Sequence, residues 1–310
     1  MPAGFDIIGD VHGRAGALAR LLAKLGYDDW GHHPEGRQAL FVGDLNDKGP
    51  DSQAVTDRVE AWVGAGRARA ILGNHELNAV AWNTPGEDGK PLRRHSAAHR
   101  KQHAAQLAER ARNPWAYSRA IAFYRTLPLW LDLGELRLIH ACWDADAVAV
   151  LERRIGAGEP VRKKALRKMF TPGHALHAAV ETAAKGPEIA LPKLLHYRDA
   201  QGALRTKGRE KWWMPPDAPL RDVVLASGGR DLPRAARSKK MKRPPGVRTL
   251  YRDPVPVFFG HYHLKRKPFV TAPNAACVDF GAGSGRWLAA YRFSGKPLRD
   301  ADFVKVRANA

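Results

Sequence analysis

The chain has 310 residues, of which 44% are hydrophobic and 26% are charged, so its composition is that of a globular protein and excludes a disordered chain. Its 51 lysines and arginines outnumber its 31 aspartates and glutamates, which gives a net charge of +20. This excess fits either a solvated, arginine-rich surface or a polyanionic partner such as nucleic acid, a nucleotide or polyphosphate.

The cysteine count and the lengths of the apolar runs indicate the cellular compartment. Cys142 and Cys277 are the only cysteines, too few for a disulfide framework. No apolar run reaches membrane-spanning length, so we expect no membrane partner. Residues 2–4 lead straight into an apolar run, without the charged and apolar segments of a secretory signal. We therefore expect a cytoplasmic protein.

The first predicted element is a buried strand at residues 5–8, followed by the loop GDVHG at 9–13. A helix is predicted from residue 15 to 25, because Leu18, Leu21, Leu22 and Leu25 recur at helical spacing. Ligands bind in open α/β sheets at the carboxyl ends of strands, where this loop lies. Read alone, its Asp-Val-His sequence fits a plain turn or a pair of metal ligands equally well.

Two more units of the same kind follow. A strand at 38–42 runs into GDLNDKGP at 43–50, and a helix capped by Asp51 or Ser52 comes next. A strand at 69–72 then precedes GNHE at 73–76. Acidic and imidazole side chains thus recur at one sheet edge, which structural turns do not require.

Further along, residues 93–125 are predicted to be helical and basic, and 127–133 and 135–139 form a hairpin. Residues 145–250 match no motif and carry basic runs. We interpret them as an inserted cap-like region with a hairpin whose strands lie near 194–198 and 203–213. Strands are also expected at 256–259, 275–280 and 287–293, the last two joined by the glycine-rich residues 281–285.

The motifs GDVHG, GDLNDKG and GNHE, together with His140-Ala141 and the GHYH sequence at 260–263, resemble the calcineurin-like metallophosphoesterase superfamily. The resemblance is strongest to the bacterial phosphoprotein-phosphatase and diadenosine-tetraphosphatase-like branch. It implies one domain over residues 1–310 with an α/β fold, a four-layer αββα sandwich of two mixed sheets. In this sandwich the strands at 275–280 and 287–293 would complete the second sheet.

The resemblance also implies a two-metal site. Asp10 and His12 would hold the first cation, Asp44 would bridge, and Asn74, His140 and His261 would complete the second; His263 is expected to return to the first. This oxygen and nitrogen ligand set suits Mn²⁺, our first expectation, and also Fe, Zn, Co, Ni or Mg. Cys142 is close in sequence to His140, but we expect it to be a small buried hydrophobic residue.

The chemistry that follows is hydrolysis of a phosphate monoester, in which a hydroxide shared by the two cations attacks phosphorus in line. By resemblance, His75 protonates the leaving oxygen and Asp47 orients its imidazole. Lys48 and Asn74 would contact the phosphate. Lys48 departs from the family, which usually has an arginine at this position. A lysine contacts phosphate as a point charge and lacks the two parallel hydrogen bonds of a guanidinium. Other phosphate-binding arginines are not identified; Arg93, Arg94, Arg153 and Arg154 are candidates by charge alone.

Three functions stay open. The first is a phosphatase acting on a phosphoprotein, a nucleotide or a dinucleoside polyphosphate. The second is a phosphodiesterase acting on a cyclic nucleotide or an RNA end, because both histidines of GHYH also occur in such enzymes. The third is a non-catalytic nucleic-acid-binding protein with a vestigial site. Trp212-Trp213 is the one candidate for base stacking, and we expect it to pack on the core instead.

Overall fold

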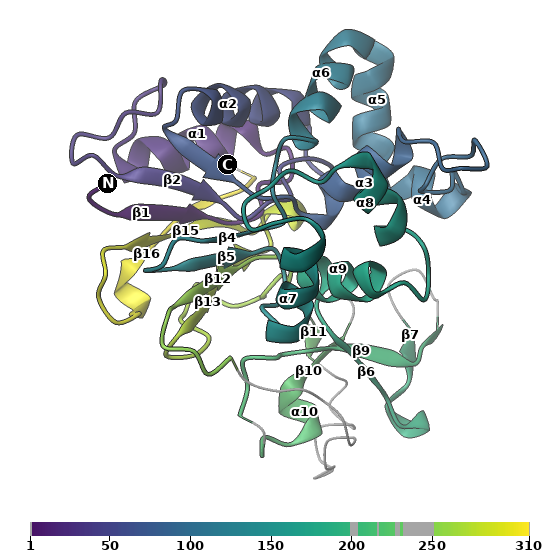
Figure 1. Cartoon of the computed structure of the whole chain (residues 1–310). Helices are drawn as coiled ribbons and strands as arrows, with labels where there is room; N and C mark the ends of the chain where they lie inside the picture. Colours follow the sequence, from purple (N-terminus) through teal and green to yellow (C-terminus); the bar gives the residue numbers. More distant parts are fainter. Residues whose placement is uncertain (1, 199–203, 216, 227–229, 232–250, 310) are drawn as a thin grey trace.

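A computed structural model of the chain describes residues 2–198, 204–215, 217–226, 230–231 and 251–309. Two sheets form its centre (Figure 1). The first has the order β14-β15-β1-β2-β3, with β16 also paired to β15. Its strands are β1 (Phe5–Ile8), β2 (Gln38–Phe41), β3 (Ala68–Ala70), β14 (Asp279–Phe280), β15 (Trp287–Phe293) and β16 (Phe303–Arg307).

The second sheet has the order β13-β12-β5-β4. Its strands are β4 (Trp130–Asp132), β5 (Arg137–Ile139), β12 (Val257–Phe259) and β13 (Ala275–Cys277). Strands β1, β2 and β3 run parallel to one another, as do β5, β12 and β13, while β15 and β4 are antiparallel to their neighbours. Both sheets are therefore mixed, as predicted.

The two sheets pack face to face because alternate residues of their strands are apolar. Ile7, Leu40 and Ile71 of the first sheet share one buried cluster with Leu138 and Phe258 of the second. The opposite face of the first sheet is covered by α1 (Ala15–Leu25) and α2 (Ser52–Gly64), and α7 (Ala145–Arg154) and α9 (Ala175–Lys185) lie beyond the second (Figure 1). This confirms the αββα sandwich.

The helices begin and end where the sequence provides caps. In α1, Leu18, Leu21, Leu22 and Leu25 are buried as predicted, and Gly26 ends the helix at a φ of 101°. The Asp51 side chain accepts a hydrogen bond from the Ala54 N–H at the start of α2. The other helices are α3 (Asn74–Trp82), α4 (Ala97–Gln102), α5 (Ala104–Arg112), α6 (Pro114–Tyr124), α8 (Lys163–Met169) and α10 (Leu220–Val223). None of the helices in the described ranges is long and apolar enough to cross a membrane.

A third, antiparallel sheet lies within the region that the sequence marks as an insertion. It has the order β11-β10-β9-β6, formed by β6 (Glu188–Ala190), β9 (Lys207–Glu210), β10 (Val224–Ala226) and β11 (Arg230–Asp231). Trp212 and Trp213 follow β9 and are 3% and 4% exposed. Their rings contact Phe259 and Tyr262, and Trp212 Nε1 donates to the Ala141 carbonyl at 2.9 Å. The tryptophans therefore anchor the inserted sheet to the sandwich, as expected.

Two predictions about strands are wrong in part. The expected long hairpin is short: only β7 (Tyr197–Arg198) pairs with β8 (Leu204–Arg205), and its turn at 199–203 lies outside the described residues. Strand β9 pairs instead with β6 and β10, whose edges it can reach. Residues 275–280 are not one strand of the second sheet. The chain crosses between sheets at Val278, so β13 lies in the second sheet while β14 and β15 extend the first.

Candidate active site

The three loops that follow β1, β2 and β3 converge at one edge of the first sheet. The Val11 and His12 amides donate to the Asp44 carbonyl at 3.0 and 2.8 Å, which locks the first loop to the second. A Cβ at Gly43 would lie 2.3 Å from the Gly73 nitrogen, so only glycine permits the second and third loops to approach this closely. The carboxyl ends of parallel strands thus bring the motifs together, as predicted.

Backbone strain is concentrated at this edge. Among the described residues, six that are not glycine have a positive φ, and all six belong to the predicted motifs: His12, Asp44, Asp47, Lys48, His261 and His263. Such conformations are costly for residues with a Cβ and persist only where the surrounding structure enforces them. The six strained conformations therefore lower the stability of the fold, and they direct these side chains toward a common space.

The first predicted ligand group centres on His12. Its Nε2 lies 3.5 Å from Asp44 Oδ2 and 4.0 Å from Asp10 Oδ2. Because Nδ1 donates to the Asn46 carbonyl at 3.0 Å, Nε2 carries the lone pair that a cation would use. Lys48 Nζ lies 2.7 Å from that same Nε2, so positive charge already gathers where the first cation is predicted.

The second predicted ligand group lies on the other side of Asp44. His140 Nε2 is 3.4 Å from Asp44 Oδ1 and 3.2 Å from Asn74 Oδ1, while its Nδ1 donates to the Val42 carbonyl. Asp44, His140 and His261 offer donor atoms within 4.8 Å of one another. His261 Nε2 is buried with no hydrogen-bond partner. An unpartnered imidazole nitrogen beside buried carboxylates fits a divalent cation.

The protonation preferences reflect this crowding of charge. Burial alone would raise the pKa of Asp44, but the His140 and His75 imidazoles hold it well below its usual range. Burial and then the neighbouring Asp279 carboxylate raise the pKa of Asp10 well above its usual range. Burial and then the Arg209 guanidinium lower the pKa of His261, which favours the neutral, ligating form. Although burial opposes it, the Asp44 carboxylate raises the pKa of His140 to about 10. The Asp44 carboxylate is therefore held as an anion by the imidazoles around it, while His261 favours its neutral form.

The predicted pair of His75 and Asp47 is formed. His75 Nδ1 lies 2.7 Å from Asp47 Oδ2, and its Nε2 is left facing Asp44 Oδ2 at 3.9 Å. A second imidazole, His103 at the α4–α5 junction, also contacts Asp47 Oδ2 at 3.5 Å. Although burial opposes it, hydrogen bonds from His103 and His75 lower the pKa of Asp47, which keeps this carboxylate charged. The sequence did not indicate His103, which follows none of the motifs.

His263 lies in the same cavity on the Asp10 side. Its amide donates to Asp279 Oδ2 at 2.6 Å, and its Nε2 lies 3.0 Å from the Ser284 hydroxyl. Asp279 also accepts from the Gly281 amide, so one buried carboxylate ties His263 to the glycine-rich loop. Its role as a ligand stays a prediction.

Glu76 is a residue whose role the sequence did not reveal. It is fully buried, and its two carboxylate oxygens accept from the amides of Gly73, Asp44, Leu45 and Asn46 and from the Asn46 side chain. Burial and then the Asp44 carboxylate raise its pKa to about 7. Glu76 therefore clamps the second and third motif loops together. Its place in GNHE was the only signal available.

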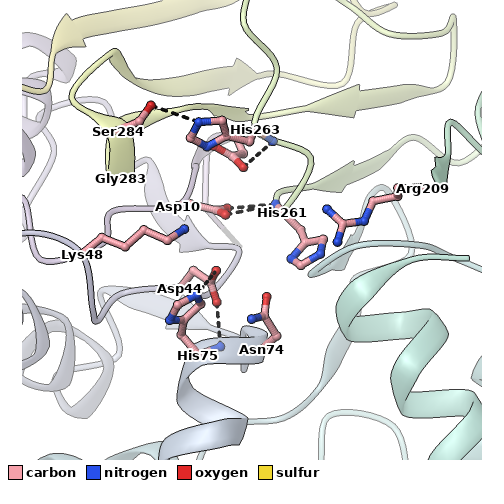
Figure 2. Close-up of a pocket in the computed structure, with 11 residues that line it drawn as sticks. Asp10, Asp44, Lys48, Asn74, His75, Arg209, His261, His263, Gly283 and Ser284 are labelled. Carbon is pink, nitrogen blue, oxygen red and sulfur yellow. Dashed lines mark hydrogen bonds and ion pairs between the residues drawn. The ribbon is translucent and has the colours of Figure 1, made fainter. Parts of the chain in front are cut away.

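The side chains enclose a cavity of 340 Å³ (Figure 2). It is lined by Asp10, Asp44, Lys48, Asn74, His75, Arg209, His261, His263, Asp279, Gly283 and Ser284. Arg209 comes from β9 of the inserted sheet, and its guanidinium is directed toward His261 (Figure 2). The sequence analysis did not identify Arg209, because nothing in the sequence distinguishes it from the other basic residues.

The four arginines that the sequence suggested as phosphate-binding residues do not line the cavity. Arg94, Arg153 and Arg154 are exposed, and Arg93 donates to Asn78 and Gln102.

Comparisons with known proteins agree with the motifs. Residues 4–150 match the family model of calcineurin-like phosphoesterases. The asymmetrical bis(5'-nucleosyl)-tetraphosphatase of Bacillus subtilis is 32% identical over 158 residues, which cover 49% of this chain and 62% of that protein. The same-named protein of Oceanobacillus iheyensis is 35% identical over 44% of this chain and 54% of its own length. The chain thus matches only part of the length of these curated relatives.

A solved structure supports the fold. It is a protein serine/threonine phosphatase from Saccharomyces cerevisiae with similarity to human phosphatase PP5, 15% identical, with a TM-score of 0.51 over 99% of this chain and 79% of that one. The sandwich, the five motifs at its edge and the match to the family model agree with one another. Residues 4–150 are therefore similar in sequence to calcineurin-like phosphoesterases, and the fold agrees with that similarity.

Proposed function

We propose that this protein is a metal-dependent phosphohydrolase that cleaves phosphate monoesters of phosphoproteins or nucleotides, or dinucleoside polyphosphates. The observation that carries the proposal is the convergence of two carboxylates, one amide and four imidazoles from five separate loops around Asp44. Six left-handed residues hold these loops in strained conformations. A fold that needed only stability would not retain this strain at one place.

The donor set fits two divalent cations. Asp10, His12 and Asp44, with His263, would hold one, and Asp44, Asn74, His140 and His261 would hold the other. Cations bound there would supply Lewis acidity and lower the pKa of water. Manganese is our first expectation because oxygen and imidazole donors without thiolate suit it. Cys142 and Cys277 are both buried and unpaired, which supports a reducing compartment, the cytoplasm.

Three other side chains in the cavity, those of His75, Lys48 and Arg209, would act on the substrate directly. His75 would donate a proton from Nε2 to the leaving oxygen, and its contact with Asp47 through Nδ1 supports this role. Lys48 and Arg209 approach the cavity from opposite sides and would bind the phosphate oxygens (Figure 2). Arg209 supplies the bidentate geometry that Lys48 lacks.

The substrate class is supported by the relatives. Both carry the name bis(5'-nucleosyl)-tetraphosphatase, so a dinucleoside polyphosphate is our first candidate among the phosphorylated substrates. The phosphodiesterase alternative keeps one supporting observation, namely that His263 lies in the cavity. The nucleic-acid-binding alternative loses its stacking candidate, because Trp212 and Trp213 are buried.

A substrate panel tests the proposal. Purified protein with Mn²⁺ is assayed on p-nitrophenyl phosphate, bis-p-nitrophenyl phosphate and diadenosine tetraphosphate. We expect metal-dependent turnover of the first and third, and loss of at least about 100-fold in Asp10→Asn and His75→Ala. Turnover of the diester alone would favour a phosphodiesterase. No metal-dependent turnover of any ester, with salt-sensitive RNA binding that Asp44→Asn leaves unchanged, would favour the nucleic-acid-binding alternative.

A further inference from the structure

One face of the inserted sheet continues the active site. Across the three strands β6, β9 and β10, Glu188, Arg209 and Leu225 are register partners, so their side chains share one face. Lys207 lies two residues before Arg209 on β9 and therefore points to the same face. A second cavity, of 220 Å³, lies on this face. It is lined by Glu188, Tyr197, Arg205, Lys207, Gly208, Arg209, Leu225 and Ala226.

Arg209 joins the two cavities because it lines both. Its Nε is buried and has no hydrogen-bond partner. Within the described part of the chain, Arg209 forms no ion pair with a carboxylate; its guanidinium lies over the Tyr262 ring at 5.7 Å. A half-buried guanidinium with an unpartnered nitrogen, placed between two cavities, suits an anionic ligand.

The charge of the second cavity has the same sign. Among the described residues that line it, Arg205, Lys207 and Arg209 outnumber the one carboxylate, Glu188. Gly208, Leu225 and Ala226 complete the lining of the cavity and add no charge to it. Lys207 and Arg205 are exposed, so they attract an anion without the cost of burying their charges.

A single phosphate held between Lys48 and Arg209 would leave this second cavity unused. A chain of linked phosphates would fill it as well. With its first phosphate between Lys48 and Arg209, its further phosphates would extend beyond Arg209 into the second cavity. We propose that the β6-β9-β10 face is a binding site for the further phosphates of a polyphosphate chain, with Lys207 and Arg205 as its cations. The proposal rests on the proposed function and specifies its substrate class: a compound with several linked phosphates.

The test is direct binding of inorganic tripolyphosphate and orthophosphate to the full chain, measured by calorimetry in metal-free buffer so that chelation does not interfere. The double variant Arg205→Gln/Lys207→Gln is compared with Lys163→Gln/Lys164→Gln, which removes the same charge from exposed positions at the start of α8. We expect the first double variant to weaken tripolyphosphate binding about tenfold and to leave orthophosphate binding within about twofold. The control pair should change neither.

Equal weakening by both double variants, or no weakening by the first, would overturn the proposal. The single variant Lys207→Gln, expected to weaken tripolyphosphate binding about threefold, covers the case in which the double variant does not fold. Binding does not depend on turnover, so this result stands apart from the substrate panel. Where turnover is present, kcat/KM for diadenosine tetraphosphate should fall in the first double variant while that for p-nitrophenyl phosphate does not.

Discussion

The motif-bearing edge of the sandwich and the inserted sheet are held by different means. At the edge, six residues with positive φ are fixed by loop-to-loop hydrogen bonds and by the five bonds that Glu76 accepts. The inserted sheet consists of strands of two to four residues with a small apolar cluster of its own, anchored through Trp212 and Trp213. The edge thus holds the predicted metal ligands, while a separately anchored element brings Arg209 into the same cavity.

The largest expected effect tests the anchor. Trp212→Ala removes a buried indole and its hydrogen bond to the Ala141 carbonyl. The free energy of unfolding should fall by about 4 kcal/mol in urea titrations. Trp30→Ala is the control, because its side chain is 72% exposed and should change stability by less than about 0.5 kcal/mol. A similar small loss for Trp212→Ala would mean that the inserted sheet is not anchored there.

The second prediction tests the clamp. Glu76→Gln places an amide N–H against backbone N–H donors that now face a carboxylate. We expect a loss of about 2–3 kcal/mol in the free energy of unfolding. Glu87→Gln, an exposed position, should be nearly neutral. If the two variants behaved alike, the strained loops would be held by something other than Glu76.

The sequence predicted the edge better than the insertion, for physical reasons. Each motif places ligands directly after a strand, so Asp10, Asp44 and Asn74 could be assigned to one edge before the structure was known. Arg209 could not, because its strand has no apolar alternation and its charge is one of many. The apolar run 275–280 looked like one strand, and the crossing between sheets at Val278 depends on tertiary packing that no local pattern records.

The third prediction asks whether the inserted sheet serves the site. Arg209→Gln removes the cation that lines both cavities and should raise KM for a phosphate ester about tenfold, near 1.4 kcal/mol, with a smaller change in kcat. Lys193→Gln, an exposed charge in the same region, is the control. An unchanged KM in the Arg209 variant would show that the inserted sheet does not contribute to substrate binding through Arg209.

The smallest expected effect is a pH dependence at Asp47. The hydrogen bonds from His103 and His75 outweigh burial and depress the pKa of this carboxyl in the folded state. Its contribution to stability is therefore present above the ordinary carboxyl pKa of about 4 and is lost as the pH falls through the folded value. The stability difference between the native chain and Asp47→Asn should shrink by about 1 kcal/mol between pH 6 and about pH 3. A difference that does not vary with pH would contradict this.

The central claim is that Asp44 joins two cation sites, and metal stoichiometry tests it most directly. The native chain and Asp44→Asn are loaded with Mn²⁺, desalted and analysed for bound metal, with circular dichroism to confirm folding. The account predicts about two cations per native chain and a loss of both affinities in the variant, because a bridging carboxylate serves both sites. A native chain that holds no metal, or an Asp44→Asn variant that still holds two cations, would contradict the account.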